Sequence, residues 1–281
     1  MRFWNKYSRI MQLKSTPLCV GLDTALEMLP AMLRERTNTD SLITDALVEF
    51  NRCIIEATHD VVAAYKLNLA FYEQYGASGW LAFEKTLACI PDDCLIIADA
   101  KRGDIGNTSK AYAKAFFERY SCDALTVAPY MGKDSLVPFL EYTDNMTFVL
   151  ALTSNAGSAD FQRLSATNKS MHEKQPEAAQ ELYKHVIQSS LSWLPMPSAR
   201  NCGFVVGATH PAELAAIRAM IPNEMLLIPG IGAQGGDLAA TLRANNGAPC
   251  LINSSRAIIY ASSGNDFAEA ARKAAESFLN G

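Results

Sequence analysis

Two aspartates and a lysine follow a single apolar stretch of the chain. Asp99, Lys101 and Asp104 lie in the segment DAKRGD, directly after the residues CLIIA. Because side chains two residues apart on a strand point to the same face, Asp99 and Lys101 are expected to face the same way at the end of this strand. Charged groups at the C-terminal end of a strand in an α/β barrel are typical of catalysis. For an isolated D-x-K the alternative is a surface ion pair, which changes stability little.

A second lysine interrupts an otherwise apolar stretch. Lys66 lies within VVAAYKLNLA, where a charged side chain is unfavourable unless an acidic group pairs with it. Asp99, which we expect on the next strand, is the natural partner. Lys66 then shares a face with Asn68, and lysines and aspartates alternate across neighbouring strands. A lysine that extends its charged end into solvent is the alternative.

A glycine-rich segment follows another apolar run. Residues 229–237, PGIGAQGGD, contain a literal G-x-G-x-x-G, which is typical of dinucleotide sites. We expect a phosphate loop instead, because residues 238–265 include no aspartate or glutamate that could bind a ribose. In barrels, phosphate often binds between the loops after strands seven and eight, and Arg256 in the following NSSR segment supplies a guanidinium. The alternative is a glycine-rich turn beside a surface arginine.

Two further polar groups end apolar runs. Asp23 follows the residues CVGL, and Ser154 lies in the segment TSN after the fifth run. By itself, either one is better explained as a helix cap.

Eight short apolar runs must position these residues, and helical patterns separate them. Continuous apolar runs are typical of parallel strands that are buried on both faces. A strand followed by a helix, repeated about eight times, predicts a single (β/α)₈ barrel domain over residues 1–281, with a doubly wound open sheet as the alternative. The predicted strands are Pro17–Leu22, Val61–Leu67, Cys94–Ala98, Ala124–Val127, Met146–Leu152, Gly203–Val206, Met225–Pro229 and Cys250–Asn253.

Two segments depart from the simple repeat. Apolar residues at a spacing of three to four in the first residues predict a short N-terminal helix packed against the fold. The stretch 155–200 between the fifth and sixth strands is unusually long, polar at first and then helical in pattern. We expect an extended loop and helix there, over the mouth of the barrel.

Composition excludes several classes of protein. Of the 281 residues 49 % are hydrophobic, and the net charge of −4 argues against a polybasic nucleic-acid binder. Apolar stretches fall far short of the roughly 18 residues of a membrane span, and the first residues lack the apolar region of a signal peptide. Seven cysteines without a C-x-x-C and four histidines never spaced i, i+4 predict free thiols in a reducing cytoplasm and no metal site.

Together these segments resemble the orotidine 5′-phosphate decarboxylase family, which catalyses the last step of UMP synthesis. D-x-K-x-x-D is shared by a wider barrel superfamily, but its combination with Lys66 and PGIGAQGGD is specific. The long stretch after Ser154 and the ending NSSRAIIYA are similar to the bacterial type 2 branch. The resemblance is carried by CVGLD, AAYKLNLAF, DAKRGDIGNTS, LTSNAGS, PGIGAQGGD and NSSRAIIYA.

The resemblance implies decarboxylation of orotidine 5′-phosphate to UMP and CO₂ with no cofactor and no metal. It assigns Lys66, Asp99, Lys101 and Asp104 to a charged catalytic array, with Lys101 as the proton donor. It also implies a homodimer in which Asp104 and Thr108 enter the neighbouring subunit's site. The implied substrate contacts are Asp23 and Lys66 to the ribose, Ser154 to the pyrimidine, and Gln234 and Arg256 to the phosphate, with Pro229, Gly235 and Ser255 completing the binding set.

Two other functions stay open from the sequence. One is another phosphosugar decarboxylase or aldolase of the same superfamily. The resemblance implies that those enzymes use Mg²⁺ and have an acid where this chain has Lys66. The other is a non-catalytic phosphate-binding barrel, against which the intact charged array argues. For each of these functions, we expect a small-molecule ligand and neither a nucleic-acid nor a membrane partner.

Overall fold

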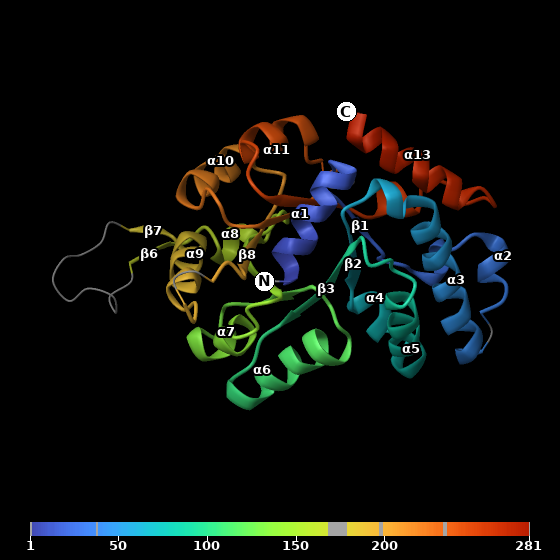
Figure 1. Ribbon diagram of the computed structural model, residues 1–281, viewed down its shortest axis with the longest axis horizontal. Helices are drawn as coiled ribbons and strands as arrows, with labels where there is room; N and C mark the ends of the chain where they lie inside the picture. Colours follow the sequence, from blue (N-terminus) through green and yellow to red (C-terminus); the bar gives the residue numbers. More distant parts are fainter. Residues whose placement is uncertain (1, 38, 168–178, 197–198, 233–234, 281) are drawn as a thin grey trace.

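Eight parallel strands close into a barrel that helices surround (Figure 1). The computed structural model describes residues 2–37, 39–167, 179–196, 199–232 and 235–280. The barrel strands are β1 Leu18–Gly21, β2 Ala64–Asn68, β3 Leu95–Arg102, β4 Ala124–Val127, β5 Met146–Leu152, β8 Cys202–Val206, β9 Leu226–Pro229 and β10 Cys250–Ser254. Their order is β1-β10-β9-β8-β5-β4-β3-β2, and β1 pairs with both β2 and β10. This closure confirms the predicted barrel over the open sheet.

All eight predicted runs form strands, with small shifts at their ends. The largest shift is in the third run, where strand β3 continues beyond the predicted end at Ala98 to Arg102. In the second run, Val61 ends a short 3₁₀ helix and strand β2 begins only at Ala64. Every residue of β1, β4, β8 and β10 is buried, because one face of each strand packs inside the barrel and the other packs against helices. Burial on both faces explains why these strands are continuously apolar in the sequence.

Most of the helices connect successive strands on the outside of the barrel. The short helical segments are η1 Leu26–Met28, η2 His59–Val61 and η3 Lys114–Arg119, the last of which continues α6. The helices are α1 Arg2–Lys14, α2 Ala31–Arg34, α3 Asp40–Thr58, α4 Ala70–Glu73, α5 Gly76–Leu87, α6 Gly106–Ala113, α7 Lys133–Leu140, α8 Ser158–Phe161, α9 Leu182–Ser192, α10 Pro211–Met220, α11 Leu238–Asn245, α12 Arg256–Ile259 and α13 Phe267–Asn280.

The predicted N-terminal helix is α1, and it covers the barrel at the N-terminal ends of the strands. Its Phe3 and Ile10 pack into the cluster that fills the barrel interior, which includes Phe148 and Met146. The rings of Phe3 and Phe148 meet edge to face with centroids 6.4 Å apart. Because α1 closes this end with apolar side chains, the open end of the barrel is the opposite one, where the strands finish.

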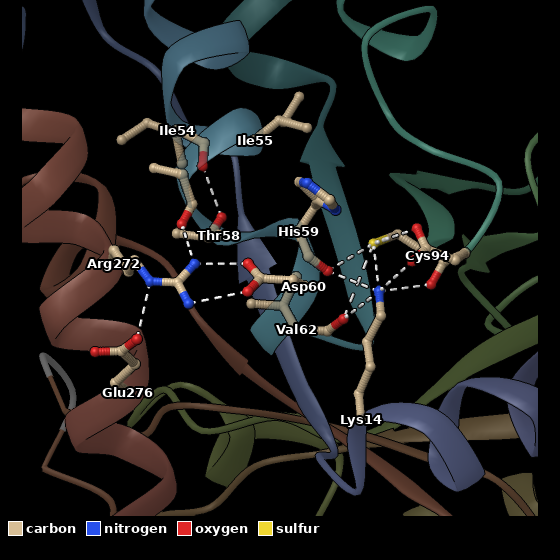
Figure 2. Close-up of polar contacts among 12 residues, drawn as sticks. Lys14, Ile54, Ile55, Thr58, His59, Asp60, Val62, Cys94, Arg272 and Glu276 are labelled. Atoms are coloured by element: carbon tan, nitrogen blue, oxygen red, sulfur yellow. Dashed lines mark hydrogen bonds and ion pairs between the residues drawn. The ribbon is translucent and has the colours of Figure 1, made fainter.

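Lys14 connects the end of α1 to residues that directly precede two neighbouring strands (Figure 2). Its buried ammonium donates to the carbonyls of His59 at 2.6 Å, Val62 at 3.3 Å and Asp93 at 2.7 Å. The Sγ of Cys94 lies 3.2 Å away. These groups precede β2 and β3, so one side chain connects α1 to the N-terminal end of the barrel.

The long segment after β5 contains the predicted loop and helix. Helix α8 begins at Ser158, after a short loop that follows the end of β5 at Leu152, and β6 Ser165–Ala166 pairs antiparallel with β7 Gln180–Glu181 before α9. In the part of the chain that the structure describes, no helix is both long enough and apolar enough to cross a membrane. All seven cysteines are free thiols, and five of them are buried.

Candidate active site

A cavity of about 460 Å³ lies at the open end of the barrel, where the strands finish. Eight of the residues predicted from the sequence line it: Asp23, Lys66, Asp99, Lys101, Ser154, Pro229, Ser255 and Arg256. Asp104, Thr108 and Gly235 do not line the cavity of their own chain. Gln234 lies outside the described residues. The topology thus brings most of the predicted set together from strands far apart in the sequence.

Asp99 connects two lysines at the bottom of this cavity. Lys66 Nζ lies 3.0 Å from Asp99 Oδ2 and 3.4 Å from Asp23 Oδ1. Lys101 Nζ lies 2.6 Å from Asp99 Oδ1. The side chain of Lys66 is only 5 % exposed, so the expectation that it needs an acidic partner, and that Asp99 is that partner, is confirmed.

Mutual attraction keeps the members of this array charged. Burial opposes the ionised form of Asp99, but the ammonium groups of Lys66 and Lys101 outweigh burial and hold the pKa of this carboxyl below its usual range. Burial likewise opposes the charge of Lys66, yet the carboxylates of Asp23 and Asp99 raise the pKa of this ammonium above its usual value. Both groups therefore stay ionised throughout the neutral range.

Lys101 reaches Asp99 by a route that simple strand alternation does not describe. The pairing of β3 with β4 shifts between Ala98 and Arg102, and the φ of Lys101 is +48°. Asp99 and Lys101 therefore lie on a bulge, not on a regular strand. The sequence argument gave the right neighbours, but alternation is not the reason for their contact.

Thr126 and Asn253 are cavity residues that the sequence analysis did not select. Thr126 Oγ1 lies 2.9 Å from Asp99 Oδ1, and Asn253 Nδ2 donates to Ser255 Oγ at 3.3 Å. Both are buried polar residues near the ends of apolar strands. A polar residue at the last position but one of the runs ALTV and CLINS is a usable signal, because a buried polar group needs a partner.

Backbone geometry explains the glycine spacing after β9. Gly230, Gly232 and Gly235 all have positive φ, at 106°, 79° and 84°, so the literal dinucleotide pattern reflects a tight turn.

On β1, a Cβ atom at Gly21 would lie 1.9 Å from Ser255 Oγ. Gly21 therefore leaves room for Ser255 beside Arg256, which begins α12.

Helix α8 supports the end of β5. The backbone N–H of Thr153 donates to Gln162 Oε1 at 2.7 Å, and Gln162 Nε2 donates to Thr153 Oγ1 at 2.9 Å. On the other side, a Cβ atom at Gly207 would lie within 2.7 Å of the backbone of Ser154. Thr153 and Ser154 are thus held between Gln162, directly after α8, and Gly207, directly after β8.

Asp104 lies on the segment that joins β3 to α6, and Thr108 lies in the first turn of α6. The carboxylate of Asp104 accepts from the N–H of Ile105 at 2.7 Å, and Ser109 Oγ lies 3.2 Å from the N–H of Asp104. Ile105 is 56 % exposed. These residues form an outward-facing edge beside the cavity.

Comparison with known proteins gives one consistent result. A family model, "Orotidine 5'-phosphate decarboxylase / HUMPS family", matches residues 16–274. The orotidine 5′-phosphate decarboxylase of Flavobacterium johnsoniae is 49 % identical over 274 residues, covering 96 % of this chain and 92 % of that protein. That of Herpetosiphon aurantiacus is 45 % identical, covering 99 % and 96 %.

Among solved structures, the OMP decarboxylase of Leishmania donovani superposes with a TM-score of 0.79 at 36 % identity, covering 100 % of this chain and 98 % of that one. The comparisons agree with the resemblance seen in the sequence motifs. The chain belongs to the orotidine 5′-phosphate decarboxylase / HUMPS family.

Proposed function

We propose that this protein decarboxylates orotidine 5′-phosphate to UMP and CO₂ without a cofactor, as the last step of UMP synthesis. The array of Lys66, Asp99 and Lys101 carries the proposal. The resemblance implies that Mg²⁺-dependent relatives have an acid at the position of Lys66, whereas here the buried ammonium of Lys66 already lies between two carboxylates. A divalent ion there would have to displace the lysine, which favours decarboxylation without metal over Mg²⁺-dependent chemistry.

The reaction breaks the bond between C6 of the pyrimidine and its carboxylate carbon. The electron pair of this bond stays on C6, where no adjacent carbonyl delocalises it, and CO₂ departs. The ammonium of Lys101 stabilises the developing charge and then transfers one proton to C6. Water returns a proton to Lys101. Asp99 repels the substrate carboxylate before the bond breaks, and this repulsion is relieved when CO₂ leaves.

The remaining cavity residues hold the rest of the nucleotide. Asp23 and Lys66 are proposed to bind the ribose hydroxyls, and Ser154 the pyrimidine. Arg256 carries the charge for the phosphate, and Pro229, Gly235, Ser255 and Gln234 complete this binding set. Phosphate lies far from C6, so its binding energy serves loop closure and orientation of the reacting group.

We infer a homodimer with shared sites, in which Asp104 and Thr108 reach into the partner's cavity. Their place beside the exposed Ile105, outside their own cavity, supports this arrangement. Mixing inactive Lys101→Ala and Asp104→Ala subunits should then restore about a quarter of wild-type activity, because about half of the dimers are mixed and each has one intact site. If the subunits exchange and no activity returns, Asp104 acts within its own chain.

The seven free cysteines support a place in a reducing cytoplasm.

The deciding experiment for the function is an absorbance assay of the purified protein with orotidine 5′-phosphate, before and after EDTA. We expect turnover that EDTA leaves unchanged and that Lys101→Ala nearly abolishes, while this variant still folds and binds UMP. Turnover that requires a divalent ion, or substantial turnover by Lys101→Ala, would refute the assignment.

A further inference from the structure

Strand β3 has an irregularity at the centre of the charged array. β3 and β4 pair regularly up to Ala98, and pairing resumes at Arg102, four residues further along β3 but only two along β4. A single β4 residue, Thr126, therefore lies opposite three residues of β3. Inside this bulge Lys101 has a φ of +48°, which a residue with a Cβ atom seldom adopts. Such a backbone persists where its surroundings hold it in place.

The hydroxyl of Thr126 replaces a bond that the bulge removes from the backbone ladder. Thr126 Oγ1 accepts from the backbone N–H of Lys101 at 3.0 Å and lies 2.9 Å from Asp99 Oδ1. A peptide N–H can only donate and an ionised carboxylate can only accept, so the hydroxyl proton goes to Asp99. Thr126 is 1 % exposed, which keeps water from competing for these bonds. One hydroxyl thus joins the backbone of the lysine to the carboxylate of the aspartate.

We propose that Thr126 is a positioning residue that acts through Asp99 and Lys101, and this proposal rests on the function proposed above. Its hydroxyl holds the bulge in the conformation that brings Lys101 Nζ to 2.6 Å from Asp99 Oδ1. Without the hydroxyl, the backbone N–H of Lys101 loses its acceptor, and the carboxylate of Asp99 loses one of its hydrogen-bond donors. The ammonium then spends less time where the reacting carbon must lie.

Substitutions that differ only in the hydroxyl test this role. Thr126→Ser keeps the hydroxyl and Thr126→Ala removes it, while both lose the methyl group. Thr126→Val keeps the shape and removes the hydroxyl. The matched control is Thr147→Val on β5, another fully buried barrel threonine, whose Oγ1 has no hydrogen-bond partner within the described residues.

We expect kcat for orotidine 5′-phosphate to fall roughly 10- to 100-fold in Thr126→Ala and Thr126→Val. Affinity for UMP should change less than about twofold, because the ribose and phosphate contacts remain. Thr126→Ser should keep most of the wild-type kcat, and Thr147→Val should match the wild type. If the alanine and valine variants fail to fold, Thr126→Cys replaces them with the same expected loss, since a thiol is a weak hydrogen-bonding group.

A second measurement does not depend on activity. Hydrogen exchange of the Lys101 backbone amide should be faster in Thr126→Ala and Thr126→Val than in Thr126→Ser, because its acceptor is gone. Equal kcat in Thr126→Ser and Thr126→Ala, or equal amide exchange, would overturn the proposal. If the wild type itself does not convert orotidine 5′-phosphate, the proposed function fails, and the exchange comparison still decides whether Thr126 holds the bulge.

Discussion

Replacing Lys66 with methionine tests whether the array is held by charge. The substitution keeps an unbranched side chain in β2 and removes the ammonium between Asp23 and Asp99, which lie 3.4 Å and 3.0 Å from it. Removing one partner of a buried ion pair costs about 3–5 kcal/mol. Asp99 keeps Lys101 and Thr126, so the free energy of unfolding should fall by a value near the lower end, about 3 kcal/mol, at pH 7.

The pH dependence of this loss is the sharper test. The folded-state pKa of Asp99 is lowered, so its contribution to stability is complete above about pH 4 and is lost as the pH falls further. The folded-state pKa of Lys66 is raised, so its contribution is complete below about pH 10 and is lost at higher pH. The difference in unfolding free energy between wild type and variant should therefore be flat from about pH 5 to 9 and shrink outside this window, by roughly 1 kcal/mol per pH unit.

Urea unfolding followed by tryptophan fluorescence, repeated between about pH 3 and 9, measures this difference. The matched control is Lys14→Met (Figure 2), because the side chain of Lys14 is equally buried, at 5 % exposed, but donates to three backbone carbonyls. Its one carboxylate partner, Asp93 at 3.3 Å, is 36 % exposed, so this ion pair contributes little. The control should lose stability with little change at acid pH and should keep its activity, since Lys14 lies at the opposite end of the barrel. A loss for Lys66→Met that stays constant from pH 7 to pH 3 would refute the electrostatic explanation.

Three further outcomes follow from the site. Arg256→Ala should mainly raise KM, with an added loss of kcat if phosphate binding drives closure, while Arg243→Ala on α11 should change neither; unchanged kinetics would place the phosphate elsewhere. Gln162→Met should weaken binding of UMP roughly tenfold and leave binding of ribose 5-phosphate unchanged, because the Gln162 side chain supports the segment that we propose contacts the base. The surface substitution Gln188→Met is its control, and equal losses for both ligands would indicate general damage. The wild-type kcat should be constant between about pH 5 and 9, because the pKa values of Asp99 and Lys66 lie outside this range; an inflection inside it that Asp99→Asn abolishes would contradict the assigned ionisation.

The glycine-rich turn illustrates how far sequence reasoning extends. The rejection of a dinucleotide site rested on the missing acidic residue, and the structure adds that each glycine of the pattern has a positive φ. The residue types of the turn are local information, so the sequence alone predicts the turn. The proposed phosphate site also needs Ser255 and Arg256 at the end of a different strand, and only the folded barrel places them at the same cavity as this turn.

The amino-acid sequence by itself determined the eight strands, the N-terminal helix and the partnership of Lys66 with Asp99. These features follow from hydrophobic patterning and from the cost of a buried charge without a partner, which are properties of single segments or of one adjacent pair. Only the tertiary structure decided that the sheet closes, that Lys101 lies on a bulge and that Thr126 joins its backbone to Asp99. The physical reason is that these features depend on the register between neighbouring strands, which is set by the packing of the whole barrel and not by any one segment.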